Sequence, residues 1–246
     1  MPNKGLTPAQ IEFLRSFDTP TVCNVIELYR LRPQTAGYMD ARIACCYPNL
    51  PPMIGYAATA TFRAAAAPLD GAQYGSLDEQ IKRFDELPGP PVVVFQDLDS
   101  PSVAATFGEV MCTSYQSFGA AGLITSGAGR DVEQVGSLEF PVFCDKLICS
   151  HGYPHIVDVH VPVHVGGLAV SPGVLLHGDA NGVTDIPAEI ATEVGPVCEE
   201  FCACEDILLD YCRSGRVTPS GYAEARAELN AAVAKLGDRV RRKRSR

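Results

Sequence analysis

The stretch from Gly108 to Asp131, GEVMCTSYQSFGAAGLITSGAGRD, places the strongest constraint on how this chain can fold. Its apolar residues at spacings of three and four predict a helix over residues 109–118, which Gly119 ends. The short apolar run 121–125 predicts a buried strand, and the glycine-rich residues 127–129 predict a turn. The two charged residues that close the stretch are therefore expected at the end of a buried strand.

Those two residues, Arg130 and Asp131, combine a cation and an anion that together suit one kind of ligand. A guanidinium presents a planar fork to a carboxylate, and an aspartate presents hard oxygen ligands to a divalent cation. The amides of Val110 and Met111, at the start of the predicted helix, can bind an anion. Together they are able to hold a metal-chelated 2-oxo acid. The plainer alternative is an Arg-Asp pair that caps or braces a loop.

The composition is that of a globular chain. Of the 246 residues, 46% are hydrophobic and 20% are charged, which suffices for one domain with a substantial core, alone or with an appendage. No apolar run approaches the ~20 residues needed to cross a bilayer, and no signal-like apolar core follows the first five residues. We therefore expect a cytoplasmic protein without a membrane segment.

Charge is distributed unevenly along the chain. The formal net charge is −9, from 20 basic and 29 acidic residues, yet six of the last eight residues, 239–246, are basic. Without those six the balance is (20 − 6) − 29 = −15. An acidic body argues against a broad nucleic-acid surface, and the basic end is expected to be a solvated, disordered tail. A nuclear-localisation or RNA-binding role for this tail is the alternative.

Cysteines and histidines are numerous but do not form a recognisable metal motif. Ten cysteines without an export signal predict reduced thiols, and no CxxC pair is present to build a thiolate zinc site. His160 and His164 fall on one predicted strand, but positions four apart on a strand lie about 13 Å from each other and cannot chelate one ion by themselves. Asp97 and Asp99, which follow a predicted strand, are secondary candidates for metal ligands.

Periodicity and breaker residues predict further elements outside the central stretch. Helices are expected over residues 8–16, 21–29, 77–87, 188–204 and 222–236. Strands are expected over residues 54–62, 92–95, 140–143, 157–165, 168–170 and 174–177, and a loop over residues 44–52. Helices interleaved with strands predict the α/β class.

Four short motifs carry a family resemblance: Gly108-Glu109, Gly119-Ala120-Ala121-Gly122, Gly127-Ala128-Gly129-Arg130-Asp131 and Phe140-Pro141-Val142-Phe143. They resemble the central pattern of the family that contains 4-hydroxy-4-methyl-2-oxoglutarate/4-carboxy-4-hydroxy-2-oxoadipate aldolase and the RraA-like ribonuclease E activity regulator. The similarity runs from about residue 21 to residue 215. It implies a three-layer swivelling β/β/α domain with N- and C-terminal helices, assembled as trimers or pairs of trimers. On this basis residues 1–215 are expected to form the aldolase-like domain, and residues 216–246 a helical extension with a basic tail.

The resemblance also assigns roles to residues of the central stretch. Arg130 matches the arginine that binds the substrate's carboxylate and keto oxygen, and Asp131 matches the metal-binding aspartate. Val110 and Met111 match positions whose backbone amides hold the pyruvyl carboxylate, next to Gly108, which is also expected to contact the substrate. These assignments predict an active site that binds a 2-oxo acid together with Mg²⁺ or Mn²⁺.

Two acidic residues and three departures complete the resemblance. Glu109 matches a catalytic acidic position near the metal's waters, and Glu205 matches an acidic residue that a neighbouring subunit contributes. Ser126 and Asn24 stand where the family commonly has Asp, and the segment 64–91 is longer than in compact relatives. The departures weaken the expectation for the substrate more than the expectation for the metal.

The function implied is a divalent-metal lyase that cleaves or decarboxylates 2-oxo acids through a pyruvate enolate. The central stretch contains no lysine, so a Schiff-base aldolase is disfavoured. The alternative is a non-catalytic relative that binds and regulates a ribonuclease. Such relatives typically lack an acid directly after the arginine, and Asp131 therefore favours the enzyme. A lyase that acts on another hydroxy acid is a third possibility, because Ser126 departs from the family pattern.

Overall fold

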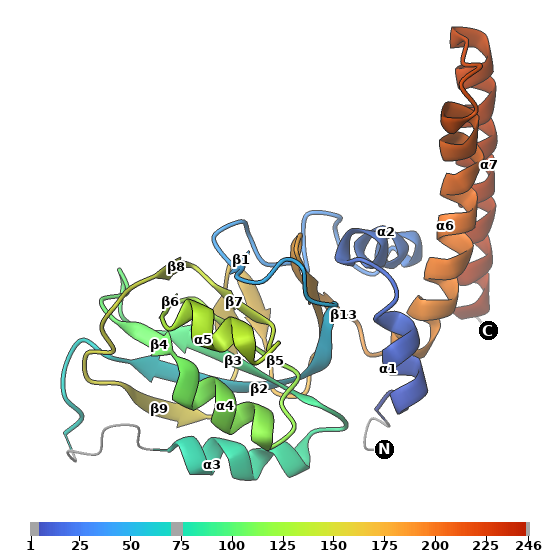
Figure 1. Cartoon of the computed structure of the whole chain (residues 1–246). Helices are drawn as coiled ribbons and strands as arrows, with labels where there is room; N and C mark the ends of the chain where they lie inside the picture. The colour runs from blue at the N-terminus through green and yellow to red at the C-terminus, as the bar shows by residue number, and fades with distance from the viewer. Residues whose placement is uncertain (1–4, 70–75, 245–246) are drawn as a thin grey trace. The chain divides into compact units, whose positions relative to one another are not determined.

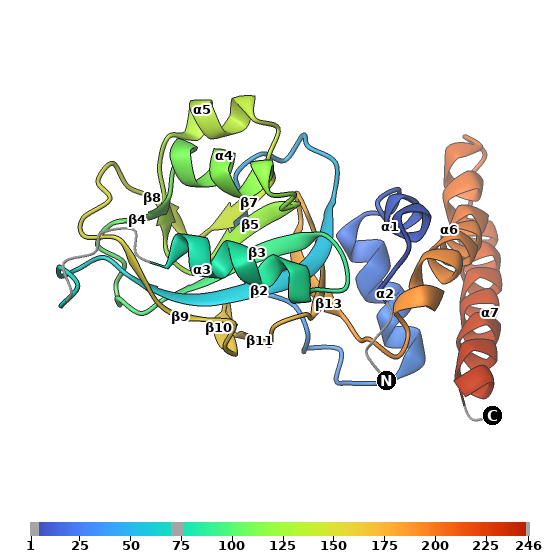
Figure 2. The same ribbon diagram turned by 90° about the horizontal axis from the view of Figure 1, so that it is seen from below.

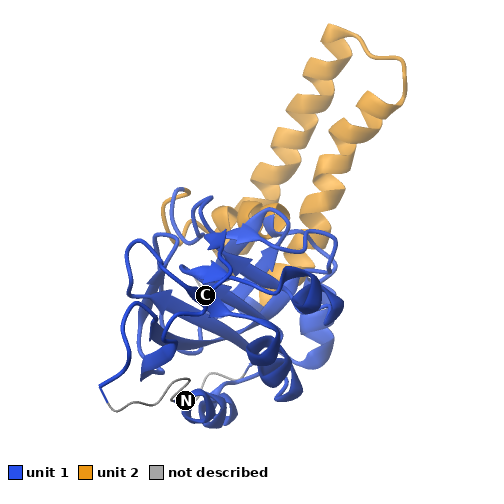
Figure 3. Cartoon of the chain, turned by 60° about the vertical axis from the view of Figure 1, so that its left-hand side comes forward, with its two compact units in different colours: residues 1–19, 35–191 blue, residues 20–34, 192–246 orange. Residues whose placement is uncertain are grey.

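The computed structural model describes residues 5–69 and 76–244, which form two compact units (Figures 1 and 3). Unit 1 contains the chain up to residue 19 and residues 35–191, and unit 2 contains residues 20–34 and 192–246. No helix in the described part of the chain is long and apolar enough to cross a membrane. The predicted α/β class with helices at both ends of the chain is confirmed.

A mixed sheet forms the centre of unit 1. Its strands lie in the order β1 (Ala44–Cys45), β7 (Val142–Cys144), β5 (Gly122–Thr125), β3 (Pro91–Asp97), β2 (Met53–Arg63), β12 (Leu175–Asp179) and β13 (Gly182–Ile186). The four central strands, β7, β5, β3 and β2, are parallel, and their neighbours pair antiparallel. Strand β9 (His155–Val159) pairs with the second half of β2. The long β2 is buried along nearly its whole length, as expected for a strand covered on both faces.

The two faces of the sheet are covered by different elements (Figure 2). One face carries α3 (Leu77–Lys82), a short 3-10 helix (Arg83–Glu86), α4 (Glu109–Ser117) and α5 (Val132–Ser137). The other face carries the hairpin of β10 (Val163–Val165) and β11 (Leu168–Val170). Successive residues of β3 alternate between the two cores, with Val93 and Phe95 toward the helices and Val92 and Val94 toward the hairpin. The burial of both faces fixes the register of the sheet.

A second, three-stranded parallel sheet was not predicted. It consists of β4 (Ala105–Phe107), β6 (Ala128–Gly129) and β8 (Lys146–Leu147). The expectation of a turn at residues 127–129 is therefore wrong for Ala128 and Gly129, whereas Gly127 lies in a bend. Strands of two or three residues are too short to show a period of two, and only pairing with distant segments makes them strands.

Three other expectations are corrected. Residues 44–52 contain the short strand β1. The strand expected over residues 157–165 is interrupted, because His160 adopts a φ of 60° and ends β9 before β10 begins. His160 and His164 therefore do not lie on one strand. The long segment 64–91 is described only outside residues 70–75, and it contains α3 and the 3-10 helix in place of one helix over residues 77–87.

Most predicted helices are present. Helix α1 (Pro8–Leu14) begins with a capping box, in which Thr7 accepts from the N–H of Gln10 and the Gln10 side chain accepts from the N–H of Thr7. Helix α2 (Thr19–Tyr29) follows. The apolar spacing that predicted these helices corresponds to their buried residues.

Unit 2 combines most of α2 with α6 (Ala191–Arg213) and α7 (Pro219–Arg244), which form a long hairpin (Figure 3). The expectation of a disordered basic end is wrong, since α7 remains helical to Arg244. Arg239 pairs with Glu200 at 2.6 Å and Lys243 with Glu193 at 2.7 Å. These ion pairs join the basic end of α7 to acidic residues of α6. The division into domains 1–215 and 216–246 stays a prediction.

A buried polar group in unit 1 joins the last hairpin of the sheet to the start of α2. The His177 side chain is fully buried, and its Nδ1 lies 2.9 Å from Oγ1 of Thr19. Asp179 Oδ2 accepts the N–H of Thr19 at 2.8 Å. Burial lowers the pKa of His177 to about 4, because the apolar surroundings disfavour the charged imidazolium. The imidazole is therefore neutral in the folded protein at neutral pH.

This shift predicts a pH dependence of stability. The unfolded chain binds a proton at His177 below about pH 6.5, while the folded chain binds it only near pH 4, so stability falls as the pH drops through this window. The expected loss is up to about 3 kcal/mol. Urea unfolding at pH 7.5, 5.5 and 4.5 measures it. The slope should be shallower in His177→Gln and unchanged in His155→Gln, whose imidazole is half-buried and forms its hydrogen bond at the surface. Equal slopes in the wild type and His177→Gln would contradict the assignment.

Candidate active site

A cavity of about 350 Å³ lies in unit 1 where the central stretch of the sequence folds back on itself. It lies beside β4, the start of α4 and the residues that follow β6. Most of its wall is apolar, and its ionisable members are Arg130, Asp131 and His151. Its lining residues are Leu77, Ala105, Phe107, Gly108, Val110, Met111, Arg130, Asp131 and His151. An apolar hollow with a few converging charged groups is the usual form of a small-molecule site.

Strand β6 determines where Arg130 lies. The N–H of Arg130 donates to the carbonyl of Phe107 on β4, and the carbonyl of Gly129 accepts from Ile148 beyond β8. A Cβ on Gly129 would lie 2.1 Å from the Phe107 ring, so a glycine is required at this position. The small sheet thus holds the backbone that precedes the charged pair from both sides.

Asp131 joins the end of this strand to the start of α4. Its Oδ2 accepts the N–H of Glu109 at 3.0 Å and lies 3.6 Å from Nε of Arg130. A Cβ on Gly108 would lie 2.5 Å from this oxygen, so the contact depends on a glycine there. Asp131 itself has a φ of 56°, a left-handed conformation that Asp and Asn tolerate better than most residues. The carboxylate also lies at the positive end of the α4 dipole.

The residues of the cavity fit a hard divalent cation that keeps much of its hydration. The described residues contain no cluster of three or more His, Cys, Asp or Glu side chains able to enclose a metal. Mg²⁺ commonly binds through one or two carboxylates, with waters and ligand oxygens filling the other positions. Asp131 supplies one such carboxylate, about one-third exposed. The donor set therefore suits Mg²⁺ or Mn²⁺ better than a closed zinc site.

Residues 19–184, more than half of the chain, match the family described as RraA-like: Aldolase/RraA. The chain belongs to the Aldolase/RraA family. It is 33% identical over 105 residues to a Halalkalibacterium halodurans protein named "Putative 4-hydroxy-4-methyl-2-oxoglutarate aldolase", covering 42% of this chain and about half, 49%, of the relative. It is 31% identical over 119 residues to a Xanthomonas campestris pv. campestris protein of the same name, covering 48% of this chain and 71% of the relative.

Two solved structures share the fold of this chain. An uncharacterized protein from Pseudomonas syringae pv. tomato superposes with a TM-score of 0.72 at 18% identity, over 92% of this chain and 97% of that one. Streptomyces coelicolor RraAS2, described as an unusual member of the RNase ES inhibitor RraA protein family, superposes with a TM-score of 0.65 at 18% identity, over 85% of this chain and 97% of that one. At this identity the likeness concerns the fold alone.

The structure brings most of the residues predicted for an Aldolase/RraA site into one place. Gly108, Val110, Met111, Arg130 and Asp131 all line the cavity. The predicted roles of these residues stay predictions, and their common location is the observation. Two further predicted residues are not among those that line it.

Glu109 and Glu205 are the two predicted residues outside this wall. Glu109 contributes its backbone N–H to Asp131, while its exposed side chain is not among those that line the cavity. Glu205 lies on α6, in unit 2. Asn24, one of the departures from the family pattern, lies on α2 and also belongs to unit 2. The other departure, Ser126, accepts the N–H of Asp97 at 2.9 Å and so joins the ends of β5 and β3.

The secondary metal candidates brace a loop. Asp99 Oδ2 accepts the N–H groups of Ala64 and Ala65 at 2.7 and 2.8 Å, and Asp97 Oδ1 accepts the N–H of Asp99 at 2.9 Å. Burial raises the pKa of Asp97. Neither residue lines the cavity, so their observed contacts correspond to a structural role.

Three thiols of unit 1 make contacts that no sequence motif indicated. Burial raises the pKa of Cys112, on α4, to about 12, so this thiol stays protonated and is a poor metal ligand. Cys46 and Cys144 bring their sulfur atoms to 3.4 Å although they are 98 residues apart. The hydrogen bond from Cys46 lowers the pKa of Cys144. Only the pairing of β1 with β7 reveals this contact.

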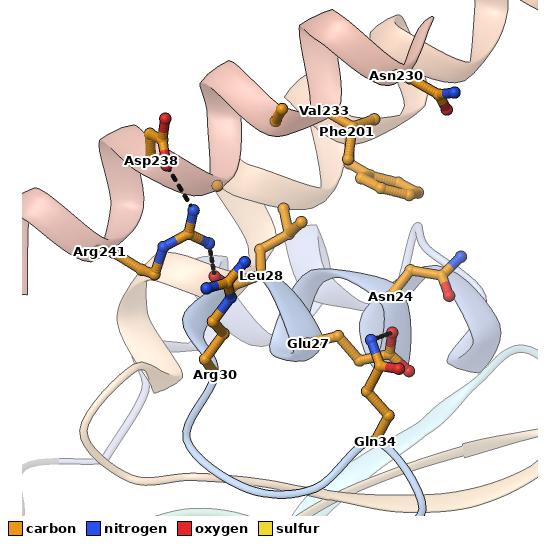
Figure 4. Close-up of a pocket in the computed structure, with 12 residues that line it drawn as sticks. Asn24, Glu27, Leu28, Arg30, Gln34, Phe201, Asn230, Val233, Asp238 and Arg241 are labelled. Carbon is orange, nitrogen blue, oxygen red and sulfur yellow. Dashed lines mark hydrogen bonds and ion pairs between the residues drawn. The ribbon is translucent and has the colours of Figure 1, made fainter. Parts of the chain in front are cut away.

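Unit 2 contains another hollow, of about 570 Å³, whose polar residues largely bond to one another (Figure 4). Arg241 donates to the carbonyl of Leu28 and to Asp238, both at 2.6 Å, and Gln34 donates to Glu27 at 2.8 Å. None of the residues that line this hollow belongs to the central stretch. The cavity of unit 1 is therefore the candidate active site.

The left-handed backbone of Asp131 predicts different effects for two substitutions. Asp131→Asn keeps a side-chain acceptor and a residue type that tolerates positive φ, so its free energy of unfolding should stay within about 1 kcal/mol of the wild type. Asp131→Ala loses the acceptor for the Glu109 N–H and adds backbone strain, at an expected cost of about 1–3 kcal/mol. Urea unfolding compares the two. An alanine variant as stable as the asparagine variant would show that the contact contributes nothing to folding.

Proposed function

We propose that this chain is a divalent-metal-dependent lyase that cleaves or decarboxylates 2-oxo acids through a pyruvate enolate. The observation that carries the proposal is the convergence of the Arg130 guanidinium and the Asp131 carboxylate on one mostly apolar cavity at the N-terminus of α4. Family membership and relatives named as 4-hydroxy-4-methyl-2-oxoglutarate aldolases support it. The two sheets and the helical layer of unit 1 suit the three-layer swivelling β/β/α arrangement, which we assign to it.

The start of α4 binds the substrate's carboxylate in this proposal. The first N–H groups of a helix have no partner within the helix, and here Asp131 takes the N–H of Glu109. The N–H groups of Val110 and Met111 are then the next donors at the helix N-terminus, where the dipole favours an anion. Gly108 lets the ligand approach without a side chain in the way.

Arg130 and Asp131 act on the 2-oxo group. The guanidinium donates to the keto oxygen and stabilises the negative charge that develops there as the enolate forms. Asp131 would hold the Mg²⁺ or Mn²⁺ ion, which supplies Lewis-acid polarisation of the 2-oxo acid when bound. The apolar wall keeps water away from the side of the ligand that it covers and so strengthens these electrostatic contributions there. No lysine is among the described residues that line the cavity, which argues for an enolate over a Schiff base.

Activity assays test the proposal directly. Release of pyruvate from 4-hydroxy-4-methyl-2-oxoglutarate and from oxaloacetate is measured with added Mg²⁺ or Mn²⁺, after subtraction of the rate without enzyme. Asp131→Asn and Arg130→Lys should each lower kcat/KM by about 10²- to 10³-fold. The first removes a negative charge, and the second removes the planar guanidinium that acts on the enolate.

The matched control is an exposed Arg-Asp pair elsewhere in the chain. Arg42 and Asp40 lie 2.7 Å apart, with side chains 71% and 43% exposed. Arg42→Lys and Asp40→Asn should leave the activity unchanged. Full activity in Asp131→Asn would sink the proposed mechanism.

A ribonuclease-binding protein is the second candidate, favoured by the fold shared with RraAS2 and by the basic end of α7. Arg239 and Lys243 form ion pairs with glutamates, which reduces the positive charge that this end of α7 presents to a partner. We therefore rank it below the lyase. Capture of a ribonuclease at physiological salt, with no turnover of any 2-oxo acid, would reverse the order.

We further propose a homotrimer or homohexamer in which Glu205 of one subunit completes the cavity of another. The cavity is open toward solvent in a single chain, and α6 presents Glu205 on a partly exposed helix. Mixing Asp131→Asn with Glu205→Gln, each inactive alone, should restore part of the activity after subunit exchange, because some interfaces then combine an intact Asp131 with an intact Glu205.

Differently tagged subunits and light scattering establish that mixed oligomers have formed. Absence of complementation in those oligomers would refute the shared site, and a monomeric wild type would refute the assembly.

A further inference from the structure

We propose that this cavity prefers 2-oxo acids whose far end is uncharged and apolar, and that Leu77 determines this preference. The inference rests on the proposed lyase function and deepens it, because it names the class of substrate. The compound in the relatives' names, 4-hydroxy-4-methyl-2-oxoglutarate, carries a second carboxylate at its far end. The preferred substrate of this chain has a hydrocarbon group in that place.

The charged groups of the cavity are assigned to the end that every 2-oxo acid shares. Arg130 and the amides at the start of α4 bind the carboxylate and keto oxygen, and Asp131 holds the divalent ion. His151 is the other ionisable residue of the wall, and its Nδ1 lies 2.8 Å from the carbonyl oxygen of Gly152. Among the described residues that line the cavity, Arg130 is the only one with a permanent positive charge.

The rest of the wall is apolar. It consists of Gly108 and the side chains of Leu77, Ala105, Phe107, Val110 and Met111. A second carboxylate placed against these side chains would lose water and meet no cation there, which is costly for a charged group. A hydrocarbon group in the same place gains free energy by leaving water. The wall therefore favours a substrate with one carboxylate over a substrate with two.

Leu77 belongs to the segment 64–91, which is longer here than in compact relatives. It is the first residue of α3, and it also packs against the core on the helical side of the sheet. No basic residue of this segment precedes Lys82 in the sequence. Lys82 pairs with two acidic residues of α3 at 2.7 and 3.2 Å, and Arg83 pairs with Glu86 at 3.0 Å. The described part of the segment thus adds an apolar side chain to the cavity and no unpaired cation.

A buried amide holds α3 beside α4 and the sheet (Figure 2). Gln80 is 1% exposed, and its Nε2 donates to the carbonyl of Ala58 on β2 at 2.9 Å. Its Oε1 accepts the hydroxyl of Tyr115 on α4 at 2.5 Å. The ring of Phe84 lies 6.0 Å from that of Tyr115, centroid to centroid. Leu77, one turn before the amide, is therefore a fixed part of the wall.

Unreactive analogues test the preference without turnover. 2-Oxoglutarate and 5-methyl-2-oxohexanoate have the same length and shape, but the second has two methyl groups where the first has the oxygens of its far carboxylate. Neither has a C4 hydroxyl, so neither undergoes the proposed cleavage. Isothermal titration calorimetry of the wild type with Mg²⁺ should show the methyl analogue binding about tenfold or more tightly than 2-oxoglutarate.

Leu77→Arg places a cation in the wall and should reverse the preference. The residue one turn further along α3 is the apolar Ile81, so the new guanidinium has no acidic neighbour at that position. 2-Oxoglutarate should bind about tenfold more tightly than to the wild type, and the methyl analogue more weakly. Leu69→Arg is the matched control, because Leu69 lies in the same segment but is fully exposed and outside the cavity wall. It should leave both affinities unchanged.

Turnover is compared with a matched pair of hydroxy acids. 4-Hydroxy-4-methyl-2-oxoglutarate yields two molecules of pyruvate, and 4-hydroxy-4,5-dimethyl-2-oxohexanoate yields pyruvate and 3-methylbutan-2-one. In both, the C3–C4 bond breaks and its electron pair forms the enolate, C4 becomes a carbonyl as its hydroxyl proton leaves, and C3 gains a proton. No further reactant is consumed. The ratio of the two kcat/KM values should shift about tenfold toward the dicarboxylate in Leu77→Arg, relative to the wild type.

The wild-type comparison decides the inference without any variant, and thermal unfolding establishes that each variant is folded. A wild type that binds 2-oxoglutarate as tightly as the methyl analogue would overturn the inference, as would equal effects of Leu77→Arg and Leu69→Arg. That first result together with cleavage of the dicarboxylate would leave the proposed lyase standing. The expected binding preference without cleavage of either hydroxy acid would support the inference and overturn the lyase. Binding of neither analogue would overturn both.

Discussion

The hydrogen bond from the N–H of Glu109 to the carboxylate of Asp131 is the contact on which the candidate site depends. It joins the beginning of α4 to the end of β6, two segments that the sequence separates by a full helix and a strand. Its geometry requires a glycine at 108 and a left-handed backbone at Asp131. Each requirement is local, but the two segments come close together only because the whole of unit 1 is folded.

The large sheet determines how close the two segments lie. Strands β3 and β5 are buried on both faces, so their register is fixed by two cores at once. Thr125, at the end of β5, is fully buried and lies 2.9 Å from Thr106 on β4, hydroxyl to hydroxyl. This contact joins the two sheets, so the position of the small sheet depends on the register of the large one. The charged pair therefore follows a strand whose position is fixed by buried contacts, as a precise binding site requires.

Elements that depend on residues close together in the sequence could be predicted, whereas those that depend on contacts between distant segments could not. The helix after Gly108 and the strand before Ser126 follow from local periodicity, and so Arg130 and Asp131 were correctly expected close to a strand end. Strand β6 was mistaken for a turn because its two residues become a strand only by pairing with β4 and β8. The order in the basic end of α7 likewise comes from glutamates dozens of residues away. His151 belongs to the same class, since nothing in its neighbourhood along the sequence marks it as a cavity residue.

The wall of the cavity is built by segments that lie far apart in the chain: the central stretch contributes Gly108, Val110, Met111, Arg130 and Asp131, and the connection after β8 contributes His151. Substitutions in that connection can therefore change one part of the wall while the glycine-arginine-aspartate signature stays the same. Chains that share this signature can in consequence differ in the shape and charge of the cavity that it borders.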